Sequence, residues 1–230
     1  MIINKLLCRA ASRLKGEEFK LDDRVTDGYL LQFAFAKAMM CLRGLLRLRQ
    51  LVMVGRGTQL LATSQMRFGR SVSIDDHCVV NALSREGVVF GDHVSIQKRT
   101  IIECTGSLRY LGKGLVLGNN VGVGSNSFLG CAGGIEIGDD TIIGNYVSFH
   151  AENHNYADPE LPIRAQGVSH VGIKVGKGCW IGAKVTILDG AVIEDGCIVA
   201  AGALVTQGHY QANSIYGGVP AKRLKGRFDV

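Results

Sequence analysis

The stretch VGKGCWIGAKVTILDGAVIEDGCIVAAGALVT, residues 175–206, decides the fold of this chain. An aliphatic residue returns at every sixth position, and a small or slim residue stands four places after each of the first five. The two series are Val175, Ile181, Ile187, Ile193, Val199 and Val205, and Cys179, Val185, Ala191, Cys197 and Ala203. Neither the helical period of about 3.6 nor the strand period of about 2 produces this pattern. It indicates a parallel β-helix, in which six residues form each flat side of a triangular coil.

The same six-residue spacing extends back along the chain to Phe68, with interruptions. The pattern predicts about seven coils between Phe68 and Thr206, with Leu111 among the inward residues. The longest interruption separates Phe149 from Val175, where the inward aliphatic residues are lost. We expect the loop at about 150–172 to protrude from the prism and to carry the active site, because loops on rigid scaffolds often carry function.

Composition is that of an ordinary soluble globular protein of 230 residues, with 47% apolar and 20% charged residues and a net charge of +6. Gly is abundant, at 31 residues, and Pro is scarce, at 3. We attribute the glycines to frequent corners that need a positive φ.

The cysteines indicate the compartment. Seven are present without a CxxC pair or a zinc-ligand spacing, and Cys78, Cys179 and Cys197 fall at the small inward position of the repeat. Free cysteines used as packing residues suggest a reducing environment, and the N-terminus has no cleavable export signal. We therefore expect a cytoplasmic protein, and no nucleic-acid partner.

Both ends of the chain leave the repeat. We divide the chain into an N-terminal helical segment (1–60), a β-helix domain (61–207) and a C-terminal tail (208–230) with a short helix opened by Pro220. Residues 28–53 are the best helix candidate. Their apolar stretch, Tyr29 to Leu42, has 14 residues and is too short to span a bilayer. This helix packs against the prism end or a sister subunit, or it rests on an anionic membrane at the inner face through residues 28–50.

Two histidines of the interrupting loop, His150 and His154, lie four residues apart beside acidic and amide side chains. Histidine is the side chain best suited to move a proton near neutral pH. A loop histidine beside a crevice is able to deprotonate a hydroxyl or an amine for attack on a carbonyl group. The spacing alone does not say which histidine acts.

Four blocks carry a resemblance to a known family: IEIGDDTIIGNYVSFHAENH, VGKGCWIGAKVTILDG, VAAGALVT and YGGVPAKRLK. With them the chain resembles the hexapeptide-repeat acyltransferases, in particular the sugar O-acetyltransferases similar to maltose and galactoside acetyltransferase and those of bacterial surface polysaccharides. The resemblance implies a left-handed β-helix and transfer of acetyl from acetyl-CoA to a sugar hydroxyl, in O-antigen or capsule modification. It also implies a homotrimer with sites between subunits and a reaction that requires no metal.

The resemblance also assigns residues. His154 matches the general base, whereas His150 falls where the family has no catalytic role. Asn126 is the nearest match to an acceptor-binding residue, and Asp158 is a weaker candidate for orienting the base or binding sugar hydroxyls. The coenzyme A groove matches Trp180, Gly182, Ala183, Ala201, Gly202 and Thr206, and the phosphate-facing tail matches Lys222 and Lys225. Gln207 replaces the family's usual basic residue, which weakens the phosphate site.

Three other functions stay open. An N-acyltransferase acting on a nucleotide-linked amino sugar would use the same groove. A γ-class carbonic anhydrase would bind zinc through His150, His154 and either His93 or His170. A non-catalytic β-helix scaffold would have no need of a histidine-bearing loop.

Overall fold

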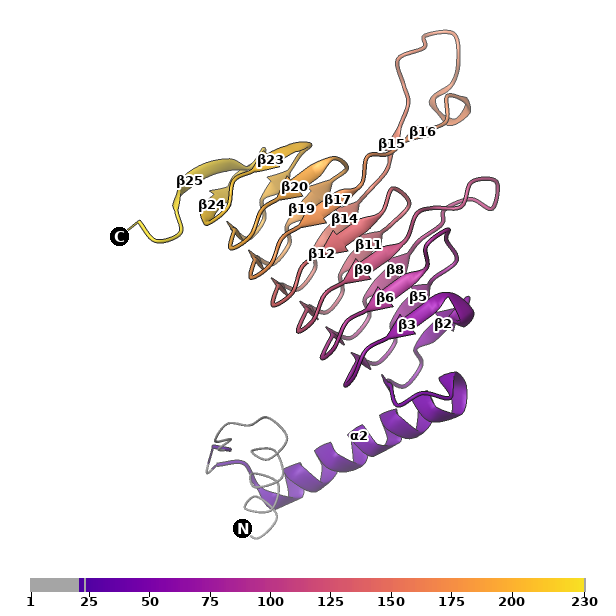
Figure 1. Ribbon diagram of the computed structural model, residues 1–230, viewed down its shortest axis with the longest axis vertical. Coiled ribbons are helices and arrows are strands. Elements are labelled where there is room, and N and C mark those ends of the chain that lie inside the picture. The colour runs from indigo at the N-terminus through magenta and orange to yellow at the C-terminus, as the bar shows by residue number, and fades with distance from the viewer. Residues whose placement is uncertain (1–20, 23, 230) are drawn as a thin grey trace.

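The computed structural model describes residues 21–22 and 24–229, and most of them form a triangular prism of short parallel strands (Figure 1). Each coil contributes one strand to each of three sheets, here called A, B and C, and sheets B and C have seven strands each. Sheet A holds β1 (Met53–Val54), β4 (Ser73–Ile74), β7 (Ser95–Ile96), β10 (Gly122–Val123), β13 (Ile142–Ile143), β18 (Trp180–Ile181), β21 (Ile198–Val199), β24 (Ser214–Gly217) and β25 (Lys222–Gly226). Sheet B holds β2 (Gln59–Leu61), β5 (Val79–Asn81), β8 (Ile101–Glu103), β11 (Phe128–Gly130), β14 (Ser148–His150), β19 (Thr186–Leu188) and β22 (Leu204–Val205). Sheet C holds β3 (Met66–Phe68), β6 (Val88–Phe90), β9 (Leu115–Leu117), β12 (Ile135–Ile137), β17 (Ile173–Val175), β20 (Ala191–Ile193) and β23 (Gly208–Tyr210). This mainly β architecture fits the expected left-handed β-helix.

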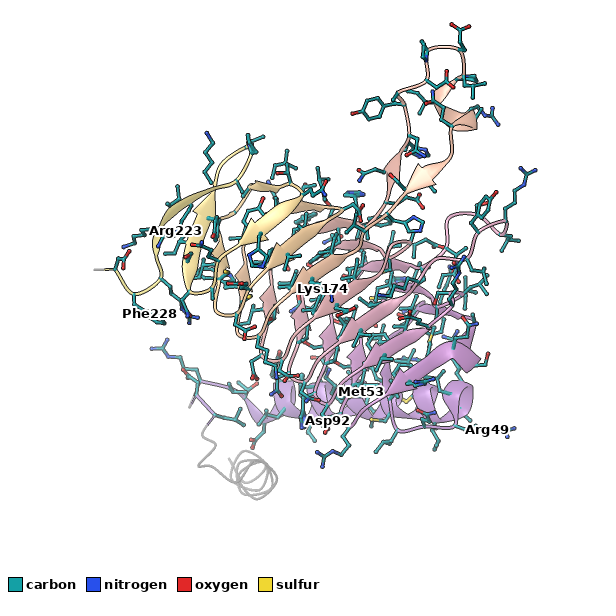
Figure 2. The ribbon with its side chains drawn as sticks, turned by 45° about the horizontal axis from the view of Figure 1, so that its top comes forward. Arg49, Met53, Asp92, Lys174, Arg223 and Phe228 are labelled. Atoms are coloured by element: carbon teal, nitrogen blue, oxygen red, sulfur yellow. The ribbon has the colours of Figure 1, made fainter. Side chains whose placement is uncertain are left out.

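The inward aliphatic residues stack coil upon coil. Phe149 pairs in register with Ile187, and Ile137 pairs with Val175 across the long loop. All six aliphatic residues of the 175–206 series are buried, as the sequence predicts. Outward residues are mixed: Trp180 and Ile142 are exposed, and Lys174 projects from sheet C at 3.5 Å from the carboxylate of Glu136 (Figure 2). The core is thus a single aliphatic column inside the prism.

The predicted start of the prism at Phe68 is wrong. Val54, Leu60 and Met66 are six residues apart and already form the buried side of a first coil. Phe68 is only partly buried, and its ring stacks on Phe90 with 5.1 Å between centroids. Phe68 also stands six residues before Ile74, and this spacing led the sequence prediction to begin at Phe68.

Leu111, expected inside, is 37% exposed. The residues that face inward at this coil are Leu115 and Leu117, because residues 104–114 form an insertion that leaves the prism. The sequence showed only a short slip in the spacing there.

Glycines such as Gly178 and Gly202 have the positive φ expected at corners, whereas those that follow the aliphatic positions serve another purpose. A Cβ on Gly182 would lie 2.6 Å from the main-chain nitrogen of Ala201, and one on Gly138 would lie 2.8 Å from the carbonyl carbon of Gly176. Neither glycine has a positive φ, whereas Tyr146 and Lys184 adopt φ near 60° at corners. These glycines are therefore required by close approach of neighbouring coils.

The predicted packing cysteines are buried. Cys78, Cys179 and Cys197 are at most 1% exposed. Burial raises the pKa of the Cys78 thiol and of the Cys179 thiol to about 11. These thiols pack as small hydrophobic groups, as the repeat predicts.

Helix α2 (Asp27–Leu48) precedes the prism and is capped by the side chain of Thr26. Arg43 and Arg47 donate hydrogen bonds to the carbonyl oxygens of Val54 (3.1 Å) and Thr58 (2.7 Å), which fixes the C-terminal end of α2 on the first coil. Figure 1 shows the N-terminal part of the helix lying away from the prism. Large apolar side chains on α2 are exposed, among them Leu31, Phe33, Phe35, Leu42, Leu45 and Leu46.

The helix is longer than the apolar stretch recognised in the sequence. It spans 22 residues, and by length and composition it is the one helix among the described residues able to cross a bilayer. Signal sequences and the core helices of globular proteins share this length and composition. These two properties therefore do not assign α2 to a membrane.

The C-terminal segment ends in a strand. The predicted helix at 220–226 is wrong, because β25 pairs antiparallel with β24 at the open end of sheet A. An exposed strand edge offers main-chain hydrogen-bond partners to an added strand, whereas an isolated helix of seven residues is unstable. The segment limits at residues 60 and 207 remain predictions, although the sheets run from β1 to β25.

Candidate active site

Two insertions leave the prism at the same corner, where strands of sheet B lead to strands of sheet C. The first, residues 104–114, joins β8 to β9 and contains a bridge between Ser107 and Tyr110. The second, residues 151–172, joins β14 to β17. It carries the antiparallel pair β15 (Asn153–His154) and β16 (Val168–Ser169), and the 3₁₀ turn η2 (Ile163–Ala165) near its tip. Figure 1 shows this second insertion projecting beyond the coils.

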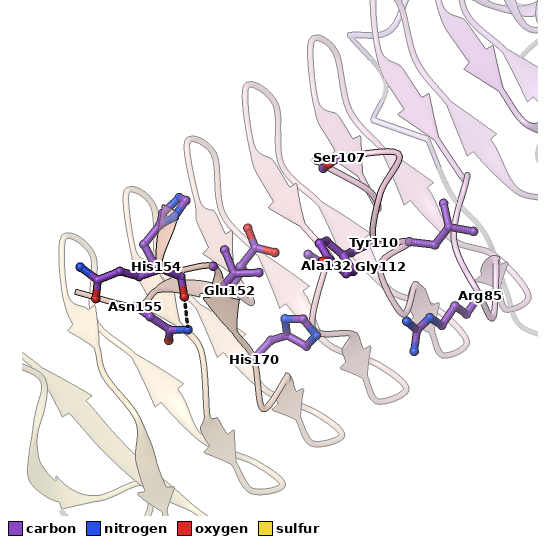
Figure 3. Close-up of a pocket in the computed structure, with 14 residues that line it drawn as sticks. Arg85, Ser107, Tyr110, Gly112, Ala132, Glu152, His154, Asn155 and His170 are labelled. Atoms are coloured by element: carbon purple, nitrogen blue, oxygen red, sulfur yellow. Dashed lines mark hydrogen bonds between the residues drawn. The ribbon is translucent and has the colours of Figure 1, made fainter. Parts of the chain in front are cut away.

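A pocket of about 620 Å³ lies between the two insertions (Figure 3). The coil between them turns its corner without an insertion, so Ala132 forms a low floor beside Gly112 of the first insertion. A Cβ on Gly112 would collide with the carbonyl oxygen of Cys104, and one on Gly133 would collide with that of Ala151. The floor therefore depends on small residues. The volume is in the range of small-molecule sites.

His154 lines this pocket from β15. Its side chain is exposed, and among the described residues no hydrogen bond to the imidazole ring is present. Glu152 and His170 line the same pocket. Glu152 directly precedes β15 and His170 directly follows β16, so they lie at the two ends of the hairpin. An imidazole that lines a pocket, with no hydrogen-bond partner among the described residues, has the chemistry of a general base.

Asp189 holds the hairpin in place, and the sequence analysis did not recognise it. It is 4% exposed, and its carboxylate accepts hydrogen bonds from the main-chain nitrogens of Val171 (2.9 Å) and Gly172 (2.7 Å) and from the amide of Asn153 (3.2 Å). One carboxylate thus joins the start and the end of the insertion. The only sequence signal is the Asp-Gly pair formed with Gly190, and such pairs are common in turns of every kind.

Asp158 lies in the outer part of the hairpin loop. Its carboxylate accepts a hydrogen bond from the main chain of Glu160, and its main-chain groups bond to the side chain of Gln166. No hydrogen bond joins it to His154 among residues 24–229, and it does not line the pocket. The described contacts give it a role in shaping the loop, and its acceptor role stays a prediction.

The predicted donor residues lie mostly at another corner, where sheet A leads to sheet B. The turns of successive coils stack there through main-chain hydrogen bonds, as between Lys184 and Asn145 and between Gly202 and Ala183. We call this stack the ridge; its left-handed turn positions are Gly57, His77, Arg99, Asn126, Tyr146, Lys184 and Gly202. Five of these seven positions carry large side chains.

Gly202 is the open end of the ridge. It has φ 73°, yet a Cβ there would meet no atom within 4 Å, and Tyr146 holds a similar φ at an equivalent turn. Backbone geometry alone therefore does not demand glycine at this position. The absence of a side chain leaves the top of the ridge flat beside Ala201 and Ala183, which fits a channel for a long thin arm.

Trp180, Lys222 and Lys225 lie on sheet A, adjoining the ridge. Trp180 is 55% exposed on β18, two strands before β24, and both lysines are exposed on β25. The Lys225 amino group donates to the carbonyl oxygen of Asp229 at 2.8 Å. Thr206 lies apart from them, after β22 on the sheet B side, where its main chain bonds to the Tyr210 hydroxyl. The predicted donor residues thus lie on the ridge and on the adjoining sheet A, with the exception of Thr206.

The structure does not bring His154 together with the ridge within one chain. On a single coil, six residues of sheet B separate Ala183 from Asp189, up to about 20 Å of extended chain. Asn126 lies on the ridge, and so it is not beside His154 either. Both remain predicted site residues, on opposite edges of sheet B.

The remaining histidines are dispersed. His150 lies on the outer face of β14 with its ring 5.5 Å from that of Phe128, and His93 occupies a turn between sheets C and A. Within residues 21–22 and 24–229, no group of three His, Cys, Asp or Glu residues is placed to hold a metal ion. The histidines named for a zinc site are therefore not assembled in one chain.

Comparisons with known proteins agree with the repeat. Residues 172–207 match the family model described as bacterial transferase hexapeptide (six repeats). A protein of Mycobacterium tuberculosis named "Probable acetyltransferase" is 30% identical over 201 residues, which cover 86% of this chain and 55% of that protein. The Escherichia coli "Putative lipopolysaccharide biosynthesis O-acetyl transferase WbbJ" is 29% identical over 122 residues, covering 50% of this chain and 62% of its own length. The chain thus spans less than two thirds of both curated relatives.

Among solved structures, a mutant of AntD, an N-acyltransferase from Bacillus cereus in complex with dTDP and coenzyme A, superposes with a TM-score of 0.53. The match covers 80% of this chain and 88% of that one at 20% identity, so it shows a shared fold. With the family model and the named relatives, it confirms the resemblance to hexapeptide-repeat acyltransferases.

Proposed function

We propose that this chain transfers an acetyl group from acetyl-CoA to a sugar hydroxyl, in modification of a bacterial surface polysaccharide. The observation that carries the proposal is His154, whose imidazole lines a pocket between two insertions of the β-helix and has no hydrogen-bond partner in the part of the chain that the structure describes. The hexapeptide match and the acetyltransferase names of the relatives support the reaction class. Acylation of an amino group on a nucleotide-linked sugar is the alternative that the experiment below separates.

In this mechanism His154 accepts the proton of the acceptor hydroxyl while the hydroxyl oxygen attacks the carbonyl carbon of the thioester. The carbon–sulfur bond breaks, and the imidazolium returns its proton to the departing thiolate, so that no covalent enzyme intermediate forms. Main-chain N–H groups at the corner would stabilise the developing oxyanion. Fixing two substrates in one groove would supply much of the acceleration.

The flat end of the ridge supports the donor site. Gly202, Ala201 and Ala183 would leave room for the pantetheine arm, with Trp180 beside it, while Lys222 and Lys225 would face the nucleotide phosphates as point charges. Because Lys225 already bonds to Asp229, Lys222 is the stronger phosphate candidate.

The separation of the two edges supports a homotrimer with sites between subunits. A single chain keeps its base and its donor ridge on opposite sides of sheet B, so a complete site needs the ridge of one subunit and the hairpin of the next. Closed cyclic symmetry would form three such sites.

We further propose a cytoplasmic protein that touches the inner face of the membrane through residues 28–50. The exposed apolar side chains of α2 support this contact, whereas Arg43 and Arg47 are engaged with the first coil. The full chain should float with vesicles rich in anionic phospholipid, and Leu31→Glu combined with Phe35→Glu should abolish flotation. Equal flotation of the two proteins would contradict the contact.

The proposed reaction is tested by incubating the protein with acetyl-CoA and a panel of sugars and amino sugars, and following free thiol and acetylated product. His154→Ala should lower turnover by about 100-fold or more, because general-base catalysis contributes that much. His150→Ala is the matched control, since His150 lies outside the pocket, and it should keep most of the activity. Full activity of His154→Ala would refute the assignment, and products acetylated only on nitrogen would favour the alternative.

A further inference from the structure

The pocket between the two insertions is electrically asymmetric. Arg85 lines it from the corner that joins β5 to β6, and Glu152 and His154 line it from the hairpin three coils later. Figure 3 shows Arg85 and His154 at opposite ends of the labelled group, with Glu152, His170 and Ala132 between them. At the spacing of parallel strands, three coils correspond to about 14 Å.

The main chain at Arg85 is held by hydrogen bonds, and the guanidinium has no partner among the described residues. Its main-chain nitrogen donates to the carbonyl oxygen of Gly112, and that of Glu86 donates to Lys113, so the corner is tied to the first insertion. Among the described residues, the Arg85 guanidinium has no ion pair or hydrogen bond. A planar guanidinium presents two parallel donors that match the oxygens of a phosphate group.

The opposite end has the reverse polarity. The Glu152 carboxylate is half-buried and has no hydrogen-bond partner among the described side chains. It would repel an anion beside His154 and would accept hydrogen bonds from neutral hydroxyl groups. A ligand with one charged end therefore has a single favourable direction in the pocket.

We propose that the acceptor is a glycosyl phosphate, bound with its phosphate on Arg85 and its sugar ring over Ala132, so that a ring hydroxyl reaches His154. Tyr110 and Leu111 form the wall against which the less polar face of the ring packs. This inference rests on the proposed acetyl transfer and adds the substrate class. A nucleotide diphosphate sugar and a lipid-linked diphosphate sugar share this chemistry.

The test compares matched acceptors on the full-length protein. Sugar 1-phosphates are assayed beside the methyl glycosides of the same sugars, with native protein, Arg85→Ala and Arg85→Lys. Arg109→Ala is the control, because Arg109 is exposed on the first insertion, next to the pocket-lining Tyr110, but does not itself line the pocket. Arg85→Ala should raise KM for the sugar phosphate by about 10- to 100-fold and leave KM for the methyl glycoside and for acetyl-CoA unchanged. Arg85→Lys should lie between, since a point charge replaces a bidentate contact.

Binding of the sugar 1-phosphate is measured in parallel by ligand-observed NMR, so the result does not depend on turnover. Equal affinity of native protein for the phosphate and for the methyl glycoside would overturn the inference, as would an equal loss on both acceptors in Arg85→Ala. If methyl glycosides are acetylated as well as the sugar 1-phosphates, the inference is refuted and the proposed acetyl transfer is retained. Arg85-dependent binding without any thiol release would instead refute the acetyl transfer.

A final comparison separates the two sources of the phosphate. A soluble nucleotide diphosphate sugar is tested against a short-chain polyprenyl diphosphate sugar in detergent micelles. The compound that resembles the natural acceptor should have the lower KM, and its KM should rise more in Arg85→Ala. A response to neither would contradict the proposed substrate class.

Discussion

The two edges of sheet B are built from the same repeat and differ in almost everything else. At the ridge, each turn stacks on the one before through a main-chain hydrogen bond, and nothing is inserted from Gly57 to Gly202. At the opposite edge, two insertions of different lengths leave the prism and enclose a pocket. The regular edge presents a continuous stack of turns, whereas the elaborated edge encloses a pocket. In the proposed function the regular edge takes the donor and the elaborated edge takes the acceptor.

The largest effect should come from mixing subunits. His154→Ala and Gly202→Tyr should each be nearly inactive alone, the first for lack of a base and the second because the ring fills the donor channel. The fold should accept the second change, since Tyr146 holds φ 60° at an equivalent turn. Mixed trimers should recover about a quarter of native activity, because one site in four then pairs an intact hairpin with an intact ridge. Thiol release after co-refolding measures this.

The control for the mixing experiment is Arg99→Tyr, which adds the same ring to a lower turn of the ridge. It should behave as native protein when alone. Failure of mixtures to recover any activity would show that both edges act within one chain, and the contrast drawn between them would be lost.

A smaller effect is expected from Asp189→Asn. The amide keeps the shape but replaces one acceptor oxygen with a donor that faces main-chain N–H groups of the hairpin. Loss of such a buried contact costs about 1–3 kcal/mol, which should loosen the hairpin and lower kcat by about tenfold. Hydrogen exchange should accelerate at residues 152–170 and stay unchanged at the ridge. Unchanged exchange in the hairpin would show that Asp189 does not hold it.

The smallest effect on activity concerns the third corner, between sheets C and A, which we expect to be structural only. Burial raises the pKa of the Cys179 thiol from its ordinary value of about 9 to about 11. The folded state therefore keeps a proton that the unfolded state loses, so stability is full below pH 9 and declines as pH rises toward 11. The loss should be about 2 kcal/mol for this thiol.

Urea unfolding at pH 7, 9 and 10.5, at fixed protein concentration, measures that decline. Cys179→Ala should flatten it and cost about 1 kcal/mol at pH 7 through the small cavity, with turnover unchanged. A change in turnover at pH 7 would mean that this corner also belongs to the site.

The repeat was readable from the sequence because a six-residue spacing admits one architecture, and the inward residues from Ile74 onward follow it. The long insertion was visible because 26 residues without the spacing cannot be stacked. The insertion at 104–114 was hidden, since Leu111 supplied an apolar residue near the expected place. Asp189 and Arg85 were invisible for another reason: their roles depend on which coils lie side by side, and no local pattern states that.

The close contact between coils has a consequence for selectivity. Insertions can leave the prism only at whole coil steps, so the gap between two of them is counted in units of about 4.8 Å. Here one plain coil separates two elaborated ones, which sets a clearance of about 9.6 Å before side chains are added. The spacing of the coils therefore sets the distance between the two insertions first, and the side chains that line the pocket adjust it afterwards.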